Sequence, residues 1–226
     1  MIKPIETIRK TSEFIKVRKP VGMPSQSDPT NDTDLMSETA RLLSDSGEQS
    51  SLWLVHRLDR VVGGLVVFAR TKRSVAALSE LASGGGMGKR YLAVAEGEVE
   101  SGEYRDFLYK DSATSKAYVV KGARKGAREA ILDCEVIVKK EGKSLLLVTL
   151  KTGRFHQIRA QLSSRKHPLV GDNKYGSRDP ISTTPALFAF GLSFELFGEK
   201  ISAKTLPPTE EYPWSVFADE IKSIEE

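Results

Sequence analysis

Residues 51–69 read Ser-Leu-Trp-Leu-Val-His-Arg-Leu-Asp-Arg-Val-Val-Gly-Gly-Leu-Val-Val-Phe-Ala. The apolar runs 51–55 and 64–69 predict two buried strands, and the polar residues 56–63 between them predict a connecting loop. A loop held between two buried strands is rigid at its ends and open in its middle, which suits functional residues. This loop presents His56, Arg57, Asp59 and Arg60 together.

The rest of the 226-residue chain supplies more strands than helices. Further strands are predicted over 14–19, 91–95, 117–120, 130–138, 145–150 and 187–197. Four helices are predicted. The first begins after a cap at Asp32 or Thr33 and ends at Leu43, and the second begins after a cap at Thr71. The third spans 155–163, and the fourth is short and lies near the C-terminus. Few connections are long enough for βαβ crossovers, so we expect an α+β fold: a mixed, mainly antiparallel central sheet with flanking helices and loops. No repeat or composition break divides the chain, which predicts a single domain over 1–226.

The composition is that of a soluble globular protein, with 39% hydrophobic and 28% charged residues. No apolar run approaches the length of a membrane span, and the N-terminus lacks the apolar stretch of a secretory signal. The single cysteine, Cys134, excludes an internal disulfide and a multi-cysteine metal site. These features favour a reducing, cytoplasmic location.

The net charge of +4 is unevenly distributed. Residues 110–128 contain six Lys/Arg and one acid, and residues 151–178 contain seven Lys/Arg. Residues 195–226, in contrast, hold eight carboxylates against three lysines. A basic middle of this kind is what a polyanion-binding surface needs, although solvated strand and loop faces have the same appearance.

Two segments carry the side chains most suited to chemistry. Asp59 lies among basic neighbours that favour its ionised form, so it is a candidate nucleophile or general base; the alternative is a surface salt-bridge cluster. Residues 152–159 follow a predicted strand and open a helix, where free N–H groups and Arg154 are suited to holding a phosphate. His156, Gln157 and Arg159 belong to the same segment, whose alternative interpretation is an ordinary amphipathic helix. Tyr91, at the entry to a strand, is suited to stacking on a base, although a half-buried core tyrosine is commoner.

Metal and nucleotide cofactors are not implied by any motif. The three histidines lack metal-ligand spacing, and neither HExxH nor paired Cys/His motifs occur. The glycines at 84–86 lack the Lys-Ser/Thr of a phosphate-binding loop, and GxGxxG is absent.

Five blocks together resemble the RluA-type family of RNA pseudouridine synthases. In order, they are Lys19-Pro20-Val21-Gly22; His56-Arg57-Leu58-Asp59 with Gly64-Leu65; Lys89-Arg90-Tyr91-Leu92-Ala93 with Glu96-Gly97; the segment Thr152 to Arg159; and Pro168-Leu169-Val170-Gly171-Asp172 with Tyr175-Gly176. Their order and spacing fit the family from about residue 14 to residue 207. Each block alone is weak, but five in order are specific.

The resemblance implies that the protein isomerises a uridine in structured RNA, either tRNA or rRNA, without cofactor or metal. It implies Asp59 as the nucleophile, attacking C1′ of the ribose or C6 of the base; Arg159 as the arginine that pairs with it; and Tyr91 as the tyrosine that packs on the target base. Arg57 matches a residue that enters the helix stack where the flipped uridine leaves it. The other expected RNA contacts are His56, Arg60, Arg154, His156, Gln157 and Lys174.

The chain departs from the family pattern in several places. Val62-Gly63-Gly64 replaces the usual Thr-Ser-Gly, Arg18 replaces an Asn, and Phe188 replaces a His. The lost hydroxyls support an alternative function as an RNA-binding module with the same fold and little catalysis. A retaining glycosidase-like hydrolase is a third hypothesis, which needs a second carboxylate near Asp59. We expect no separate N-terminal S4-type RNA-binding domain, no membrane association, and a monomer.

Overall fold

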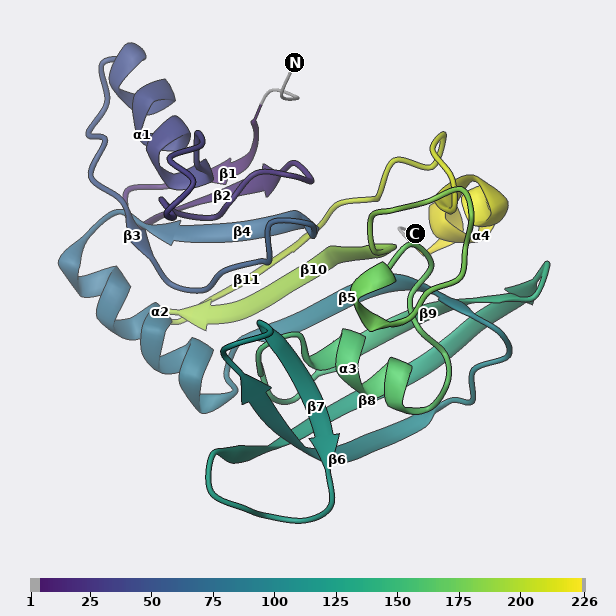
Figure 1. The fold of residues 1–226 in the computed structure, drawn as a ribbon. Coiled ribbons are helices and arrows are strands. Elements are labelled where there is room, and N and C mark those ends of the chain that lie inside the picture. The colour runs from purple at the N-terminus through teal and green to yellow at the C-terminus, as the bar shows by residue number, and fades with distance from the viewer. Residues whose placement is uncertain (1–4, 225–226) are drawn as a thin grey trace. The chain divides into compact units, whose positions relative to one another are not determined.

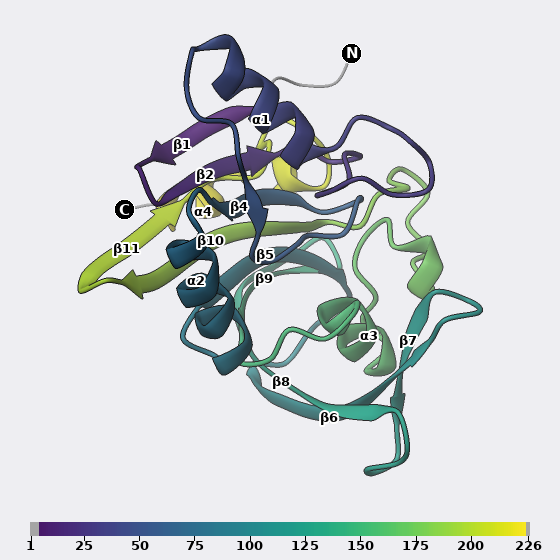
Figure 2. The same cartoon turned by 90° about the vertical axis from the view of Figure 1, so that its left-hand side faces the viewer.

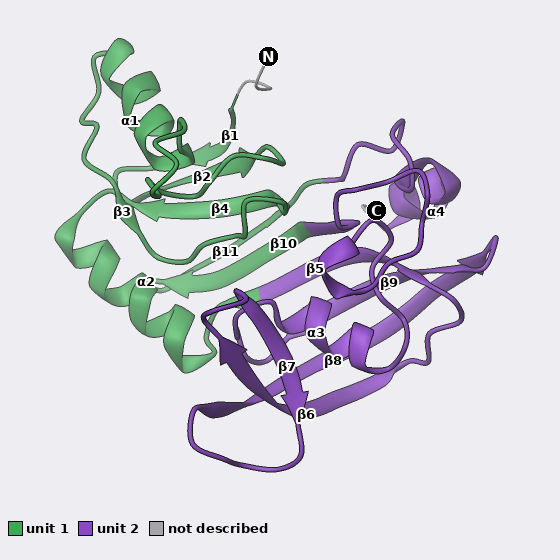
Figure 3. Ribbon diagram, in the orientation of Figure 1, with its two compact units in different colours: residues 1–88, 189–205 green, residues 89–188, 206–226 purple. Residues whose placement is uncertain are grey.

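The apolar run that follows the His56–Val62 loop forms β4 (Gly63–Ala69), in which every residue is buried. A strand buried on both faces must be covered on both sides, and this one lies inside its sheet, between β2 (Phe14–Lys19) and β10 (Leu187–Leu196). The computed structural model describes residues 5–224 (Figure 1). It divides them into two units (Figure 3).

Unit 1 comprises the described residues up to Gly88 together with Ala189–Thr205. Its strands run in the order β1-β2-β4-β10, with β11 paired to β10 and β3 paired to β4. Its remaining elements are β1 (Glu6–Lys10), α1 (Leu35–Asp45), β3 (Trp53–Leu54), α2 (Lys72–Gly84) and β11 (Glu199–Lys204). The β1–β2, β2–β4, β3–β4 and β10–β11 pairs are antiparallel.

The core of unit 1 joins α2 to the sheet. Leu78 of α2 packs with Leu65 and Val67 of β4 and with Leu192 and Phe194 of β10. Thr71 caps α2 through a reciprocal hydrogen-bonded box with Ser74, and Gly85 ends it in the left-handed conformation.

Unit 2 comprises Lys89–Phe188 together with the described residues from Leu206 onward. Its strands run in the order β5-β9-β8-β6-β7, and all four neighbouring pairs are antiparallel. The strands are β5 (Gly88–Glu96), β6 (Gly102–Asp111), β7 (Lys116–Val120), β8 (Ala127–Lys140) and β9 (Lys143–Leu150). The helices are α3 (Gln157–Ser164), η1 (Asn173–Tyr175), η2 (Trp214–Phe217) and α4 (Ala218–Ser223).

The sheet of unit 2 curls around α3, as Figure 2 shows. Ala160 of α3 packs with Leu108 of β6, Ala117 of β7 and Ala130 of β8, and Tyr175 of η1 completes this cluster. The small alanines let the helix approach the strands closely. The curvature therefore places the first turn of α3, which carries Arg159, against the inner face of the sheet.

The predicted α+β fold with a mainly antiparallel sheet is confirmed, and most predicted elements are present. Three details were wrong. The cap of α1 is Asp34, which accepts from the Ser37 N–H, and is neither Asp32 nor Thr33. The strand expected over 51–55 is only Trp53–Leu54, and the strand expected to continue to 197 turns at Phe197 into β11. The single domain over 1–226 stays a prediction.

In the part of the chain that the structure describes, none of the helices is long and apolar enough to cross a membrane. Within residues 5–224, no group of three or more His, Cys, Asp or Glu side chains is arranged to hold a metal ion.

Gly64 offers a test of the close contact between β4 and β10. Its φ is +118°, and a Cβ atom there would lie 2.3 Å from the carbonyl oxygen of Ala189. We expect Gly64→Ala to lower the free energy of unfolding by about 3–6 kcal/mol, because backbone strain and overpacking add. Gly22→Ala is the matched control: its φ is +89° with nothing within 4 Å, so it should cost only about 1–3 kcal/mol. Equal losses in urea unfolding would contradict this account.

Candidate active site

Asp59 lies in the loop between β3 and β4, where the backbone is tied down on both sides of it. On one side, Ser25 Oγ donates to the Leu58 carbonyl at 2.9 Å and accepts from the Leu58 N–H at 3.1 Å. On the other side, the Arg60 carbonyl accepts from the Gly22 N–H at 2.8 Å. Leu58 is buried, whereas Asp59 is only partly buried. The carboxylate is thus presented from a fixed backbone without being sealed inside the protein.

Lys19 strengthens this anchorage from the end of β2. Its Nζ atom is fully buried and donates to three carbonyl oxygens: Pro20 at 3.0 Å, Met23 at 2.6 Å and Arg60 at 3.0 Å. An ammonium has three N–H groups, so the three acceptors match its protonated form. Burial lowers the pKa of Lys19 to about 7, and the nearby Asp59 carboxylate opposes this shift. Because that attraction is mutual, the Lys19 ammonium stabilises the Asp59 anion.

The other charged residues of the loop have different environments. His56 Nε2 accepts from the Val67 N–H of β4 at 3.2 Å, which fixes the ring against the strand. Arg57 is exposed. Arg60 Nη2 donates to Thr30 Oγ1 and to Asp32 Oδ2, both at 2.7 Å. Of the predicted RNA contacts on this loop, Arg57 is therefore the one presented directly to solvent.

The departure at Val62-Gly63 is explained by burial. Val62 is 2% exposed, and Gly63 is buried as well. The valine side chain therefore packs in the interior, while its N–H donates to the Asp59 carbonyl at 3.0 Å. The missing hydroxyls therefore leave the exposed face of the loop unchanged.

Tyr91 and Arg159 belong to unit 2, whereas Asp59 belongs to unit 1. Tyr91 lies on β5 opposite Val148 of β9 and is 8% exposed. Arg159 lies in the first turn of α3 and is 5% exposed. The predicted pairing of Arg159 with Asp59 stays a prediction.

Asp172 is the partner of Arg159 within unit 2. Arg159 Nε and Nη2 each donate to one oxygen of the Asp172 carboxylate at 2.7 Å, and Asp172 is 1% exposed. A bidentate pair fixes the plane of the guanidinium and not only its position. The sequence analysis noted Asp172 only as part of a block and gave it no role.

A hydrogen-bonded chain continues from Arg159 to β7. Arg159 Nη1 lies 3.1 Å from His156 Nε2, His156 Nδ1 lies 3.0 Å from Tyr175 Oη, and the Ala117 N–H donates to Tyr175 Oη at 2.7 Å. Arginine has only donors, so His156 Nε2 must accept and Nδ1 must carry the proton. Tyr175 Oη therefore accepts from both His156 and Ala117. His156 adopts φ 51° and stacks on Phe155, with ring centroids 3.8 Å apart.

Gln157 has a structural task that the sequence analysis did not anticipate. The side chain is 3% exposed, and Oε1 accepts from Thr152 Oγ1 at 2.8 Å and from the Arg154 N–H at 2.9 Å. Nε2 donates to the Ile131 carbonyl at 3.1 Å. Gln157 thus ties the start of α3 to β8, and its buried amide is unsuited to the predicted RNA contact. The Arg154 N–H is one of the N–H groups at the start of the helix that were expected to hold a phosphate, and it already donates to Gln157 Oε1.

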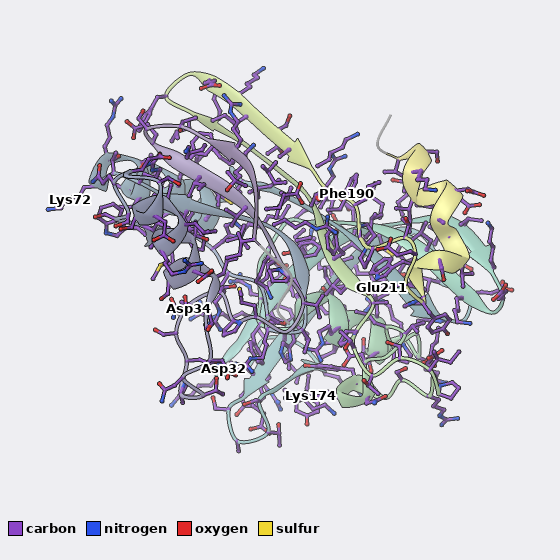
Figure 4. All side chains as sticks on the ribbon, turned by 90° about the horizontal axis from the view of Figure 1, so that it is seen from above. Asp32, Asp34, Lys72, Lys174, Phe190 and Glu211 are labelled. Carbon is purple, nitrogen blue, oxygen red and sulfur yellow. The ribbon has the colours of Figure 1, made fainter. Side chains whose placement is uncertain are left out.

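Arg154 and Lys174 lie nearer the surface of unit 2. Arg154 Nε donates to the Glu129 carbonyl at 2.8 Å. Lys174, in η1, is exposed (Figure 4). Both remain predicted RNA contacts. The residues that the sequence analysis missed are Lys19, Ser25, Asp172 and Tyr175; three of them lie in or beside the family blocks, but their partners are distant in sequence.

The sequence of the chain is similar to those of known proteins. A family model described as "RNA pseudouridylate synthase" matches residues 13–164. Ribosomal large subunit pseudouridine synthase D of Zymomonas mobilis is 30% identical over 179 residues, covering 76% of this chain and 56% of that protein. tRNA pseudouridine synthase C of Vibrio vulnificus is 27% identical over 185 residues, covering 76% of this chain and 74% of that protein.

The fold has a solved counterpart. The structure of human RNA pseudouridylate synthase domain containing 4 aligns with a TM-score of 0.78 at 19% identity, covering 94% of this chain and 92% of that chain. At this identity the likeness concerns the fold.

Lys19 predicts a pH dependence of stability. Its pKa falls from 10.5 to about 7 on folding, so between these values the unfolded chain holds a proton that the folded chain lacks. This group therefore makes the free energy of unfolding rise with pH across that window. We expect the free energy of unfolding of Lys19→Met to rise by about 3 kcal/mol less than that of the wild type between pH 7 and 9.5, measured by urea unfolding. The exposed Lys72→Met should follow the wild type; an unchanged rise in Lys19→Met would contradict the assignment.

Removing one partner of the Arg159–Asp172 pair should cost more stability than replacing both partners. Asp172→Asn leaves a buried guanidinium without its anion and should destabilise the fold by about 3–5 kcal/mol. The double variant Arg159→Met/Asp172→Leu removes both charges and should cost less than the single one. Urea unfolding of the wild type, Asp172→Asn and the double variant measures this, and a double variant less stable than Asp172→Asn would contradict it.

Proposed function

This chain belongs to the RNA pseudouridylate synthase family, and we propose that it converts specific uridines in tRNA or rRNA to pseudouridine with Asp59 as nucleophile. The RluA-type resemblance of its sequence blocks agrees with this family. The observation that carries the proposal is the presentation of Asp59: its neighbours on both sides are hydrogen-bonded in place, and its side chain stays accessible.

The reaction is an isomerisation and needs no oxidant or co-substrate. The N1–C1′ bond breaks, a C5–C1′ bond forms, C5 loses its proton and N1 gains one. Asp59 attacks either C1′, displacing N1, or C6, adding to the base; both routes require an ionised carboxylate. The Lys19 ammonium supports that requirement from within the same unit.

Arg159 and Tyr91 act on the same nucleotide in this proposal. The bidentate pair with Asp172 fixes the plane of the Arg159 guanidinium. In this proposal Arg159 pairs with the Asp59 carboxylate, as the family resemblance implies. Tyr91 packs against the target base and assists removal of the C5 proton.

RNA binding is assigned to the remaining charged residues. The exposed Arg57 fills the space that the flipped uridine leaves in the helix. His56, Arg60, Arg154, His156 and Lys174 complete the proposed contacts. Two of the similar proteins act, by their names, on ribosomal RNA and on tRNA, which supports these two substrate classes in the proposal. We place the proposed reaction in the cytoplasm. We favour catalysis over the non-catalytic alternative, because the altered residue Val62 is buried and the exposed face of the loop is kept.

Replacing Asp59 tests the nucleophile. We expect Asp59→Asn to reduce pseudouridine formation at least ~10³-fold, a loss of about 4 kcal/mol of transition-state stabilisation. Tritium release from RNA labelled at C5 of uridine measures the rate, because C5 loses its hydrogen in the reaction. Carbodiimide mapping of RNA from cells with and without the gene identifies the substrate.

The matched control is Asp45→Asn, which alters a surface carboxylate of α1 that pairs with Arg41. It should leave the rate within about threefold of the wild type, since an exposed pair contributes at most about 1 kcal/mol to stability. Asp59→Asn should also retain its affinity for RNA. Full turnover by Asp59→Asn would refute the proposed nucleophile.

A further inference from the structure

Unit 2 contains two strongly basic segments, and the first of them forms a hairpin. We call residues 107–128 the basic hairpin: the end of β6, all of β7, the loop 121–126 and the start of β8, seen in teal at the lower edge of Figure 1. Its cations are Lys110, Lys116, Lys121, Arg124, Lys125 and Arg128, and its acid between 110 and 128 is Asp111. That segment has a net charge of 6 − 1 = +5, whereas the whole chain has +4, so everything outside it sums to −1.

The cations of the basic hairpin do not form ion pairs with any described residue. Elsewhere in the same sheet, Arg105 pairs with Glu129, Lys139 with Glu98 and Glu100, and Lys151 with Asp133. Asp111 is occupied in its own turn, where it accepts from the Ala113 N–H and Thr114 Oγ1, both at 2.9 Å. The hairpin therefore keeps its charge, while the adjoining parts of the strands neutralise theirs.

Aromatic rings hold three of these cations in place. Lys110 Nζ lies 4.7 Å from the centre of the Phe155 ring, and Arg124 Cζ lies 4.9 Å from that of Tyr109. Lys116 Nζ lies 5.3 Å from the centre of the Tyr175 ring. A cation–π contact restrains a cation without neutralising it, unlike a carboxylate. The result is a positioned surface with its full charge available to an anion.

Loop 121–126 is fully exposed, and Lys121, Arg124 and Lys125 project from it together with the neighbouring Arg128. Lysines on an edge strand such as β7 also discourage pairing with other chains, but that explanation does not extend to a loop. Among residues 5–224, no carboxylate forms an ion pair with the charges in this loop. They are arranged for an external polyanion.

We propose that the basic hairpin is a docking surface for the sugar-phosphate backbone of the RNA substrate, outside the nucleotide that is isomerised. This inference rests on the proposed function for its choice of RNA. Lysine and arginine side chains bind phosphates, and phosphate contacts carry no sequence information directly. In a structured RNA helix the deep, narrow major groove also keeps side chains from reading base edges. The contact therefore adds affinity for structured RNA without selecting a sequence, and each phosphate bound makes the affinity more dependent on salt.

The test is the quadruple variant K121Q/R124Q/K125Q/R128Q. We expect its dissociation constant for a tRNA or rRNA transcript at 0.1 M salt to rise ~10–100-fold. The slope of log affinity against log salt should shrink by about 2–4, since each lost phosphate contact contributes about 1. With saturating RNA, kcat should stay within about threefold of the wild type, while KM rises.

The matched control is R41Q/R105Q/K139Q/K140Q, which removes the same four charges from cations that pair with carboxylates. It should change RNA affinity less than about threefold. An equal loss of affinity in both variants would show that only net charge matters and would overturn the proposal. A fall in kcat with unchanged KM in the hairpin variant would overturn it as well.

Binding is measured on the Asp59→Asn background too, so the result does not depend on turnover. If the wild type forms no pseudouridine but the hairpin variant still loses RNA affinity, the proposed function fails and the docking surface stands. If pseudouridine forms and RNA affinity is unchanged, the docking surface fails alone. Loss of binding to phosphatidylserine vesicles with unchanged RNA affinity would identify a lipid surface as the partner and overturn the RNA assignment.

Discussion

One buried cation, the ammonium of Lys19, connects the segments of unit 1 on which the candidate nucleophile depends. It bonds to carbonyls in the turn after β2 and in the Asp59 loop at the same time. Burial opposes the charged form, yet only the charged form has enough N–H groups for the three acceptors. The nearest compensation is the Asp59 carboxylate. The buried Lys19 ammonium therefore lowers stability but holds the Asp59 loop in place and favours the Asp59 anion. Such an exchange of stability for function is common at functional sites.

Unit 2 also buries a cation beside the candidate site residues, but there the cation is paired directly with a carboxylate. Arg159 is buried with its own anion, Asp172, and is oriented further by His156. Because its charge is already balanced, the main contribution of this guanidinium is the direction of its N–H groups rather than net positive potential. The family resemblance implies that Arg159 pairs with Asp59, and within unit 1 the Lys19 ammonium already favours the ionised form of that carboxylate.

The sequence predicted those features whose signals are local. β4 follows from a continuous apolar run, α2 from the Thr71 cap and the Gly85 stop, and Asp59 from its place in a polar loop between apolar strands. β6 was missed because its buried residues, Tyr104 and Leu108, are four apart and show no alternation. β1 was missed because it is an edge strand with almost no buried face.

Contacts between distant segments were beyond prediction from pattern alone. Asp172 is thirteen residues from Arg159, and Lys19 meets the Arg60 carbonyl forty-one residues away. Gln157 looked like an exposed polar residue at a helix start, but three backbone and side-chain partners draw its amide inside. In each case the partner comes from a segment that is distant in sequence and is brought close only by the fold.

The discontinuous make-up of unit 1 has a consequence for biosynthesis. Its core needs Leu192, Phe194 and Ile201, which leave the ribosome 123 to 132 residues after Ala69, the end of β4. Until then the nascent chain exposes the apolar faces of α2 and β4, while most of unit 2 is already translated. At typical elongation rates of about 5–20 residues per second, that delay lasts roughly 6–26 seconds. A chaperone that shields emerging chains has its clearest target in this interval.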